Sequence, residues 1–311
     1  MKPKVYIDGK EGTTGLQIYD RLASRSDIEL LLIDEDKRKD PAERKKLMDA
    51  ADIVFLCLPD AAAIEAVSLV ESETTRIIDA STAHRTNPAW AYGFPELSTE
   101  HRAAIAASKR VANPGCHASG FVSIVYPLVA MGILPADAAL SCFSLTGYSG
   151  GGKKMIADYE GEGKTEAMAS PGLYATAQAH KHLPEMKTIC GITTAPIFNP
   201  IVDDYYKGMA TTVPFHMSQL QGVSTVQEVR DRLAAHYVGQ KMVTVAEGTA
   251  SGTLYGGAQA GSDCMTLVVA GNDERFTITA LFDNLGKGAS GAAVQNMNIM
   301  LGLDETTSLS V

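Results

Sequence analysis

Four short apolar segments alternate with segments of helical character in the first third of the chain, and this alternation limits the fold more than any other feature. Each segment is largely hydrophobic, which is typical of strands that are buried on both faces. They are Lys4–Asp8, Ile28–Ile33, Ala51–Leu58 and Arg76–Asp79. Because strands that alternate with helices form a parallel, doubly wound sheet, residues 1–115 are predicted to be a Rossmann-type α/β domain.

A glycine-rich turn follows the first of these strands and leads into a helical pattern. Glycines between a strand and a helix allow the backbone to approach the pyrophosphate of a dinucleotide at the helix N-terminus. The spacing here is G-x-x-G-x-x-G rather than G-x-G-x-x-G, so a turn without a ligand is the alternative. The residues expected to bind a dinucleotide are Gly9, Gly12, Thr13, Thr14 and Gly15.

Further candidate residues follow the other strands, whose carboxyl ends lie along the same edge of a parallel sheet. They are Lys37, Arg38, Pro59, Ser81 and Arg85. Lys37 and Arg38 could bind the 2′-phosphate of NADP, although acids precede them and a solvated charged loop is the alternative. The guanidinium of Arg85 could hold a phosphate or carboxylate, or could form an ordinary surface ion pair.

One cysteine lies where a short apolar strand meets a long apolar helix. Pro114 and Gly115 produce a turn directly before Cys116, and the helix is predicted over residues 116–131. The free N–H groups and positive dipole end of a helix N-terminus favour a thiolate and could also hold an oxyanion. Cys116 is therefore a candidate nucleophile, and an ordinary buried cysteine is the alternative.

After Pro135 the pattern changes to strands with few helices. The strand-like runs are 139–146, 194–198, 209–215, 242–245, 265–270 and 276–283. One amphipathic helix is expected over residues 225–236, and a terminal helix from Gly286 to about Leu301. This half is predicted to be an α+β domain with a mostly antiparallel sheet.

A histidine cluster and a glycine-rich bend in this second half could carry chemistry. His180, His182 and Glu185 combine two imidazoles with a carboxylate that could orient one of them for acid–base work. A metal site built from the same three residues is the alternative. Lys153 follows a glycine-rich bend from Gly147 whose N–H groups could bind an anion.

Composition narrows the class of protein further. The net charge of -9 is not offset by a basic patch and argues against nucleic-acid binding. The five cysteines are odd in number and never spaced C-x-x-C, so a reducing compartment, the cytoplasm, is expected. The N-terminus begins at once with a strand pattern, which indicates no signal peptide. The uncharged run 118–134 contains serine, proline and glycine and is interpreted as a core helix rather than a membrane span.

Five motifs taken together resemble the N-acetyl-gamma-glutamyl-phosphate reductase family, in its shorter type 2 branch. They are Asn113–Cys116 with Ser119–Gly120, Asp79–Arg85, Tyr92–Leu97, His180–Glu185 and Asp283–Gly291. The resemblance implies NADPH-dependent reduction of an acyl phosphate to an aldehyde in arginine biosynthesis. It also implies that residues 285–311 complete an NADP-binding domain at 1–115, and that residues 116–284 form a catalytic and oligomerisation domain. Because enzymes of this size are commonly symmetric oligomers, a homo-oligomer, either a dimer or a tetramer, is expected.

The resemblance also implies roles for individual residues. Cys116 becomes the nucleophile and His182 the acid/base, with His180 as the second choice. Substrate binding is expected of Arg85, Lys153, His180 and Glu185, and NADP binding additionally of Asn284, Gly286, Lys287 and Gly288. The family often has an aromatic residue after the cysteine where this chain has His117. Since a residue adjacent to the nucleophile need not face it, His117 is left outside the predicted site.

Three other interpretations stay open at this point. Aspartate-semialdehyde dehydrogenase shares the cysteine and the two-domain plan. A short-chain dehydrogenase would need a Tyr-x-x-x-Lys pair on one helix, but Tyr6/Lys10 spans a strand and its turn and Tyr237/Lys241 contains a glycine. A nucleotide-sensing protein would keep the dinucleotide fold and have no need of a reactive cysteine.

Overall fold

The computed structural model describes residues 2–247 and 252–311, which form two compact units. The first unit contains the chain up to Pro114 together with Ala289–Leu309, and the second contains Gly115–Gly288 with Ser310 and Val311. The chain returns from the second unit to the first at Ala289, four residues later than predicted, because residues 285–288 are grouped with the second unit. Asn284–Gly288 is grouped with the second unit, and Ala289–Leu309, which includes the last helix, is grouped with the first.

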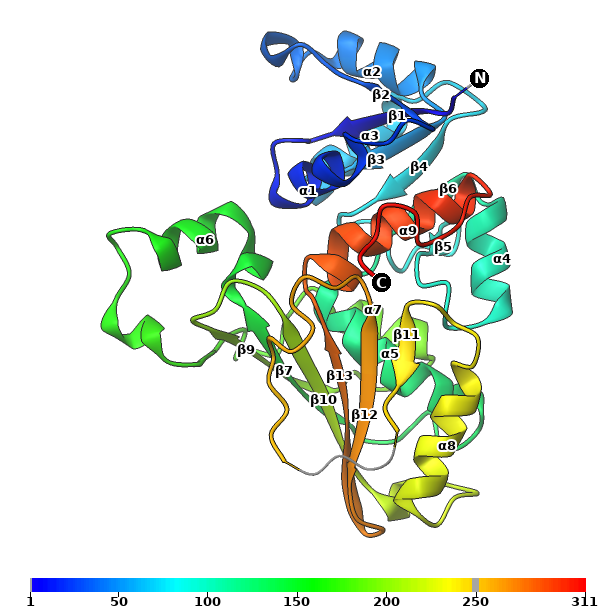
Figure 1. Ribbon diagram of the computed structural model, residues 1–311, viewed down its shortest axis with the longest axis vertical. Coiled ribbons are helices and arrows are strands. Elements are labelled where there is room, and N and C mark those ends of the chain that lie inside the picture. The colour runs from blue at the N-terminus through cyan, green and yellow to red at the C-terminus, as the bar shows by residue number, and fades with distance from the viewer. Residues whose placement is uncertain (1, 248–251) are drawn as a thin grey trace. The chain divides into compact units, whose positions relative to one another are not determined.

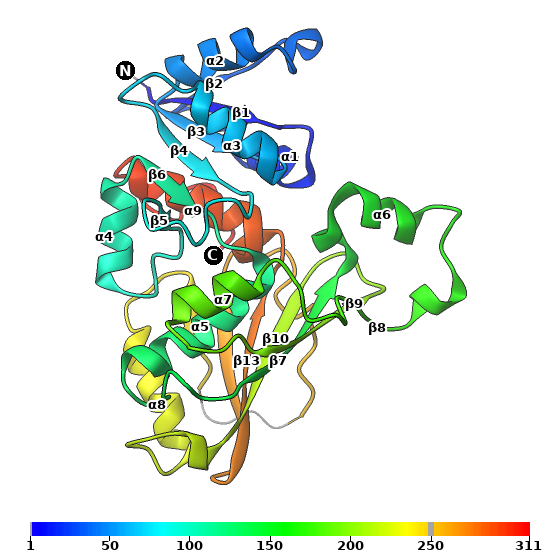
Figure 2. The same ribbon diagram turned by 180° about the vertical axis from the view of Figure 1, so that it is seen from behind.

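The first unit is built on a six-stranded, entirely parallel sheet (Figures 1 and 2). Its strands are β1 (Lys4–Asp8), β2 (Glu29–Leu31), β3 (Ile53–Leu56), β4 (Arg76–Asp79), β5 (Ala91–Tyr92) and β6 (Arg110–Ala112). Their order across the sheet is β2-β1-β3-β4-β6-β5. The chain reverses its direction of winding between β1 and β3, and ligands of doubly wound sheets bind at such a point.

Helices cover both faces of this sheet because alternate strand residues point to opposite sides. The helices are α1 (Thr13–Leu22), α2 (Pro41–Ala50), α3 (Asp60–Leu69), α4 (Thr99–Ala107) and α9 (Gly291–Met300). Ile53 and Phe55 of β3 pack in one core with residues of α1, α4 and α9, whereas Val54 and Leu56 pack in the other with residues of α2 and α3. The predicted doubly wound fold is thereby confirmed.

The second unit contains a seven-stranded mixed sheet in the order β11-β12-β13-β10-β7-β9-β8. Its strands are β7 (Ser141–Gly147), β8 (Gly172–Leu173), β9 (Ile197–Asp203), β10 (Met209–His216), β11 (Val243–Val245), β12 (Met265–Gly271) and β13 (Arg275–Phe282). Only the pairs β11–β12 and β7–β9 are parallel, and the other neighbours are antiparallel. This confirms the predicted, mostly antiparallel second sheet.

The long helix that begins at Cys116 packs on this second sheet. The helices of the unit are α5 (Cys116–Ala130), α6 (Gly152–Glu160), α7 (Leu183–Cys190) and α8 (Val226–His236). Most side chains of α5 are buried, as its largely apolar sequence predicts. No helix among the described residues is long and apolar enough to cross a membrane.

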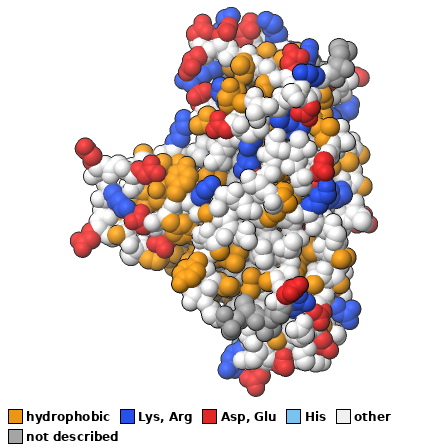
Figure 3. Space-filling view, viewed as in Figure 1, with side chains coloured by type: hydrophobic (Ala, Val, Ile, Leu, Met, Phe, Trp, Pro, Cys, Tyr) orange, Lys and Arg blue, Asp and Glu red, His pale blue; other side chains and the backbone are white. Residues whose placement is uncertain are grey.

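A lobe that carries α6 projects from the second unit (Figures 1 and 2). Hydrophobic side chains gather where this lobe joins the rest of the unit (Figure 3). Tyr148 stacks on Tyr159 there, with ring centroids 4.8 Å apart. Only a glycine-rich bend was predicted at this place from the sequence. This helix was not predicted, and Tyr159 is its one buried residue.

Candidate active site

Cys116 is the first residue of α5, and Gly115 is the N-cap. The first helical hydrogen bond of α5 runs from the Ser119 N–H to the Gly115 carbonyl at 2.8 Å. Cys116 is half-buried. A thiol at this position meets the positive end of the helix dipole, which favours the thiolate.

A carboxylate from α7 holds the turn that carries the cysteine. The Gly115 N–H donates to Oε1 of Glu185 at 2.8 Å, although the two residues are 70 positions apart in sequence. Glu185 is 2% exposed, so this bond is made away from water. Glu185 was expected to bind substrate, and the structure instead gives it a contact that positions the backbone before Cys116.

Three histidine rings of the second unit lie close together. The ring centroids of His180 and His182 are 4.7 Å apart, and His117 lies 5.6 Å from the first and 5.8 Å from the second. The His182 N–H donates to Nδ1 of His180 at 3.1 Å, which leaves Nε2 as the protonated nitrogen of a neutral His180. The structure thus brings together the two predicted histidines and adds His117.

His117 is the functional candidate that sequence analysis left out. Its Nδ1 lies 2.7 Å from Oγ of Ser144, and its Nε2 lies 2.7 Å from the hydroxyl of Tyr174. The ring is 3% exposed. Burial, and to a smaller extent the nearby His180, lower the pKa of His117 to about 3, so the imidazole is neutral at physiological pH. No spacing in the sequence marks either His117 or Tyr174 as members of the cluster.

The low pKa of His117 predicts how stability depends on pH. The imidazole titrates near 6.5 in the unfolded chain and near 3 in the folded one. Between these values the unfolded chain binds a proton that the folded chain excludes, so the free energy of unfolding falls as the pH drops. The slope is up to about 1.4 kcal/mol per pH unit. Urea titrations from pH 7.5 to 4.5 should show a flatter profile for His117→Gln than for the unmodified protein. Equal slopes would contradict the assignment.

Two of the residues predicted to bind NADP, Asn284 and Gly288, lie in the second unit, one at the glycine-rich bend and the other against the start of α5. A Cβ added to Gly288 would lie 3.0 Å from Cβ of Cys116, so this glycine lies directly against Cys116. Asn284 accepts the Gly208 N–H at 2.8 Å and donates to Oγ of Ser149 at 2.9 Å. Asn284 therefore holds the bend, and its amide is committed to protein partners.

Two lysines expected at the site differ in their surroundings. Lys287 is 1% exposed, within the π-helical turn Gly286–Ser290 that precedes α9. Lys153 is exposed on α6. Within the part of the chain that the structure describes, no group of three or more His, Cys, Asp or Glu side chains could hold a metal ion, including His180, His182 and Glu185.

In the first unit, the glycine-rich turn connects β1 to α1. Gly9 has φ of +85°, and a Cβ there would lie 2.4 Å from the Cys57 carbonyl oxygen at the end of β3. A Cβ on Gly15 would lie 2.5 Å from the Gly9 carbonyl oxygen, whereas one on Gly12 would meet nothing closer than 3.4 Å. The fold therefore requires Gly9 and Gly15 and leaves Gly12 unconstrained. Thr13 and Thr14 form the first turn of α1.

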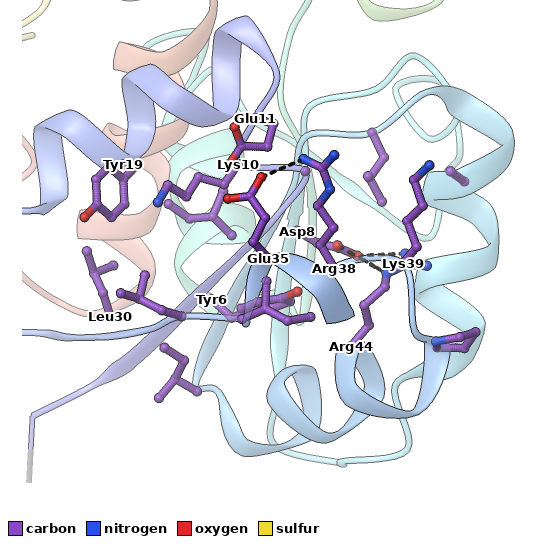
Figure 4. Close-up of a pocket in the computed structure, with 18 of the residues that line it drawn as sticks. Tyr6, Asp8, Lys10, Glu11, Tyr19, Leu30, Glu35, Arg38, Lys39 and Arg44 are labelled. Atoms are coloured by element: carbon purple, nitrogen blue, oxygen red, sulfur yellow. Dashed lines mark hydrogen bonds and ion pairs between the residues drawn. The ribbon is translucent and has the colours of Figure 1, made fainter.

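A pocket of about 450 Å³ lies beside this turn (Figure 4). Asp8 lines the pocket, and its Oδ2 forms an ion pair with Nη2 of Arg44 at 2.8 Å. The ammonium of Lys10 lies over the ring of Tyr19. Of the two predicted cations, Arg38 lines the pocket and Lys37 is not among its lining residues. Lys37 pairs with Asp34, whereas Lys39 of the same basic run does line the pocket.

The predicted residues after β3 and β4 make backbone and side-chain contacts within the first unit. Pro59 is the N-cap of α3, and the hydroxyl of Ser81 donates to Asp79 at 2.7 Å. Arg85 is 8% exposed, and its guanidinium donates to the carbonyls of Asn113 and Ala80 at 2.9 and 3.1 Å. Arg85 was expected to bind a substrate anion. The structure shows it bonded to the end of the strand that leads to the cysteine.

Comparison with known proteins identifies the family. Residues 4–105 match the model of the semialdehyde dehydrogenase NAD binding domain, and residues 116–284 match that of the semialdehyde dehydrogenase dimerisation domain. The N-acetyl-gamma-glutamyl-phosphate reductase of Chelativorans sp. is 47% identical over 308 residues, which are 97% of this chain and 99% of the relative. The chain belongs to the N-acetyl-gamma-glutamyl-phosphate reductase family. The resemblance noted in the sequence is confirmed, and the chain is an oxidoreductase of this family.

Other relatives agree with this membership. A protein of Nostoc sp. named N-acetyl-gamma-glutamyl-phosphate reductase 2 is 45% identical and covers 99% of both chains. Among solved structures, aspartate semialdehyde dehydrogenase II of Vibrio cholerae in complex with ASA superposes with a TM-score of 0.72. It covers 97% of this chain and 99% of its own at 15% identity, so it supports the fold alone.

Proposed function

We propose that the protein reduces N-acetyl-L-glutamyl 5-phosphate to N-acetyl-L-glutamate 5-semialdehyde and phosphate, with NADPH as the reductant, in arginine biosynthesis. The observation that carries the proposal is Cys116 at the N-terminus of α5, in the same unit as the cluster of His117, His180 and His182. The names of the relatives at 45–47% identity support the same reaction.

The chain's own residues supply two parts of this reaction. The Cys116 thiolate attacks the acyl carbon, and N–H groups at the start of α5 stabilise the oxyanion. Phosphate then departs, and the acyl group remains on the sulfur as a thioester. NADPH, when bound, supplies the hydride that reduces the acyl group to the aldehyde. His182 supplies the one proton that the overall reaction consumes. The backbone N–H of His182 donates to Nδ1 of His180 and so orients the His180 ring.

Substrate contacts are proposed for Lys153 and His180. Lys153 is exposed on α6. His180 lies within the histidine cluster, and its Nδ1 accepts the backbone N–H of His182, so its Nε2 side is the one proposed to face the substrate. Arg85 donates to the Asn113 carbonyl and Glu185 accepts the Gly115 N–H, and we assign both side chains a positioning role.

The first unit fits a dinucleotide, and NADP in particular. Gly12 needs no glycine for packing, so its missing side chain leaves room for a ligand at the N-terminus of α1. The adjacent pocket of about 450 Å³ is lined by Arg38 and Lys39, which suit a 2′-phosphate. Support also comes from the matched NAD binding domain and from a structurally similar protein, the aspartate semialdehyde dehydrogenase of Candida albicans, which was solved with NADP.

The role of Gly12 can be tested directly. Because a Cβ at Gly12 finds space within the protein, Gly12→Ala should leave the melting temperature unchanged and raise the Kd for NADPH about tenfold or more. Fluorescence titration with NADPH measures the Kd. Gly163→Ala is the matched control, since a Cβ there meets nothing within 4 Å and the site lies in the α6 lobe. Unchanged NADPH binding in Gly12→Ala would contradict the cofactor assignment.

Aspartyl phosphate is the second candidate substrate, because structural neighbours of this chain are aspartate semialdehyde dehydrogenases. Steady-state NADPH oxidation with N-acetylglutamyl phosphate and aspartyl phosphate side by side separates the two. We expect kcat/KM to favour N-acetylglutamyl phosphate by at least about a hundredfold, since a site that hydrogen-bonds the N-acetyl amide would reject an analogue that lacks this group. A preference for aspartyl phosphate would overturn the proposed substrate.

We further propose a homo-oligomer that uses the outer face of the second sheet. Ser144 of β7 points to α5, so Phe143 on the same strand points away from it, and Phe143 is 44% exposed. Leu173 and Ile197 on neighbouring strands are 53% and 62% exposed. The matched family model for these residues is named as a dimerisation domain.

A charge on this face should prevent association. Phe143→Asp would place a carboxylate in an apolar interface, where burial without a partner is costly, so sedimentation velocity should show a monomer at micromolar concentration. Val238→Asp is the control, because Val238 is 76% exposed and lies after α8. An unchanged oligomer in Phe143→Asp would exclude this face as the interface.

The proposed compartment is the cytoplasm. All five cysteines are free thiols, as is usual in a reducing compartment, and the proposed reaction draws on reduced NADPH. Fractionation of cells that express the tagged protein tests this placement, and recovery from the membrane or an exported fraction would contradict it.

A further inference from the structure

The two histidines of the proposed site lie in a segment without regular secondary structure. Residues 174–182 connect β8 to α7 and form neither a helix nor a strand. Such a segment lacks the ladder of backbone hydrogen bonds that fixes a helix or a strand, so its position depends on individual contacts. The rings of His180 and His182 are therefore placed only as precisely as these contacts allow.

Contacts with β9 hold the backbone of the first half of this segment. The Tyr174 N–H donates to the Pro200 carbonyl at 3.1 Å. The side-chain amide of Gln178 bonds both the N–H and the carbonyl of Phe198 at 2.8 Å. Ala175 and Gln178 have positive φ, at 50° and 54°, a conformation that non-glycine residues adopt where the surrounding structure imposes it.

The side chain of Tyr174 is bound from a different element, by His117 of α5. Nε2 of His117 lies 2.7 Å from the Tyr174 hydroxyl. On the other side of the ring, Nδ1 lies 2.7 Å from Oγ of Ser144, which in turn lies 2.7 Å from Oγ1 of Thr211. Because both ring nitrogens are engaged and the ring is buried, His117 has a fixed orientation. It ties the segment 174–182 to the helix whose first residue is Cys116.

The His117 ring also packs against both histidines of the segment. Its centroid lies 5.6 Å from that of His180, with the two rings at 87°, and 5.8 Å from that of His182. His180 and His182 are joined to each other as well, since the His182 N–H donates to Nδ1 of His180 at 3.1 Å. A displacement of the His117 ring would therefore affect the placement of both.

His117 suits such a place because it carries no charge. Burial lowers the pKa of His117, so its imidazole is neutral at physiological pH. A positive charge at this distance would oppose protonation of His182, whereas a neutral ring permits His182 to hold the proton that it is proposed to donate.

We propose that His117 is a positioning residue that holds the segment 174–182 on α5 through its bond to Tyr174, and so fixes His180 and His182 for the half of the reaction that consumes a proton. The inference rests on the proposed function, in which Cys116 is the nucleophile and His182 supplies the proton. It assigns a role to His117 and Tyr174, which take no part in the chemical steps of that function.

The first test separates the two halves of the reaction by stopped flow. Release of phosphate in the absence of NADPH measures attack by Cys116, and oxidation of NADPH by the preformed acyl-enzyme measures the half that needs the proton of His182. Tyr174→Phe removes only the hydroxyl that His117 binds. The loss of a bond that positions a proton donor should slow NADPH oxidation about tenfold and leave phosphate release within about threefold of normal.

Two further variants show whether His117 and Tyr174 act together. His117→Phe keeps an aromatic ring but cannot bind the Tyr174 hydroxyl, so it should also slow NADPH oxidation about tenfold. The double variant should be no slower than either single variant, because all three break the same bond. Tyr205→Phe is the matched control and should leave both rates unchanged, because the buried Tyr205 hydroxyl has no hydrogen-bond partner among the described residues. Tyr174→Phe carries the test alone if His117→Phe fails to fold.

Hydrogen exchange tests the bond without reference to activity. Backbone amides of residues 174–182 should exchange about tenfold faster in Tyr174→Phe than in the unmodified full-length protein, because local opening of the segment becomes easier. Peptides from α8 should exchange at the unmodified rate, since this helix does not carry the segment.

The outcomes distinguish this inference from the function on which it rests. Unchanged NADPH oxidation or unchanged exchange in Tyr174→Phe, an equal loss in both halves of the reaction, or losses that multiply in the double variant would each overturn the positioning role and leave the proposed function intact. Failure of the unmodified protein to release phosphate from N-acetylglutamyl phosphate would overturn the proposed function, and hydrogen exchange would then still decide whether His117 holds the segment.

Discussion

Replacement of Cys116 by serine is expected to lower the rate of NADPH oxidation with N-acetylglutamyl phosphate by at least about a thousandfold. A serine hydroxyl is not ionised at neutral pH, and the helix N-terminus that favours a thiolate cannot compensate for so weak an acid. Serine is close to cysteine in size, so the fold should be preserved. A stopped-flow or steady-state assay at 340 nm measures the loss.

Intact mass spectrometry without NADPH identifies the covalent step. The unmodified protein mixed with the acyl phosphate should gain the mass of the N-acetylglutamyl group, and Cys116→Ser should gain none. Cys264→Ser is the control, because Cys264 is also half-buried. This replacement should leave the adduct unchanged. An adduct that persists in Cys116→Ser would place the acyl group on another residue.

Removal of the Glu185 carboxylate is expected to have the second largest effect. Glu185→Ala leaves the buried Gly115 N–H without its acceptor at the turn before Cys116, which should cost about 2 kcal/mol of stability. A displacement of the nucleophile by about 1 Å costs about a hundredfold in rate, so kcat should fall by that order. Urea unfolding and steady-state kinetics measure the two effects separately.

Glu185→Gln is the matched variant, since its amide oxygen can still accept the Gly115 N–H. We expect it to recover most of the stability and much of kcat. If Glu185→Ala lost stability but kept its full kcat, the carboxylate would only support the fold and the positioning role would be wrong.

The fold could be predicted further than the site. The strands of the first sheet are buried on both faces, and this leaves an uninterrupted apolar signal in the sequence, as in Ile53–Leu56. The helix α2 was not predicted, although Asp40 as N-cap and Pro41 in the first turn are ordinary start signals. It lacks a clear apolar face, with only Arg44 and Met48 buried.

The site depends on contacts that no local pattern encodes. The bond between Gly115 and Glu185 spans 70 residues, and that between His117 and Tyr174 spans 57. Adjacent residues on a helix point about 100° apart, so the sequence could not tell whether His117 faces the histidine cluster. Sequence patterns did single out Cys116 and His182 as candidates, because a turn and a dense polar cluster mark them.

The left-handed residues near Tyr174 have an evolutionary consequence. Of the non-glycine residues in the described chain, only Ala175, Gln178 and Ser308 have positive φ, and two of these three lie in one short loop. Each such residue costs about 1 kcal/mol or more relative to glycine. A glycine at position 175 would relieve that cost and would also let the loop sample other conformations. Selection for thermal resistance and selection for turnover would therefore favour different residues at this one position.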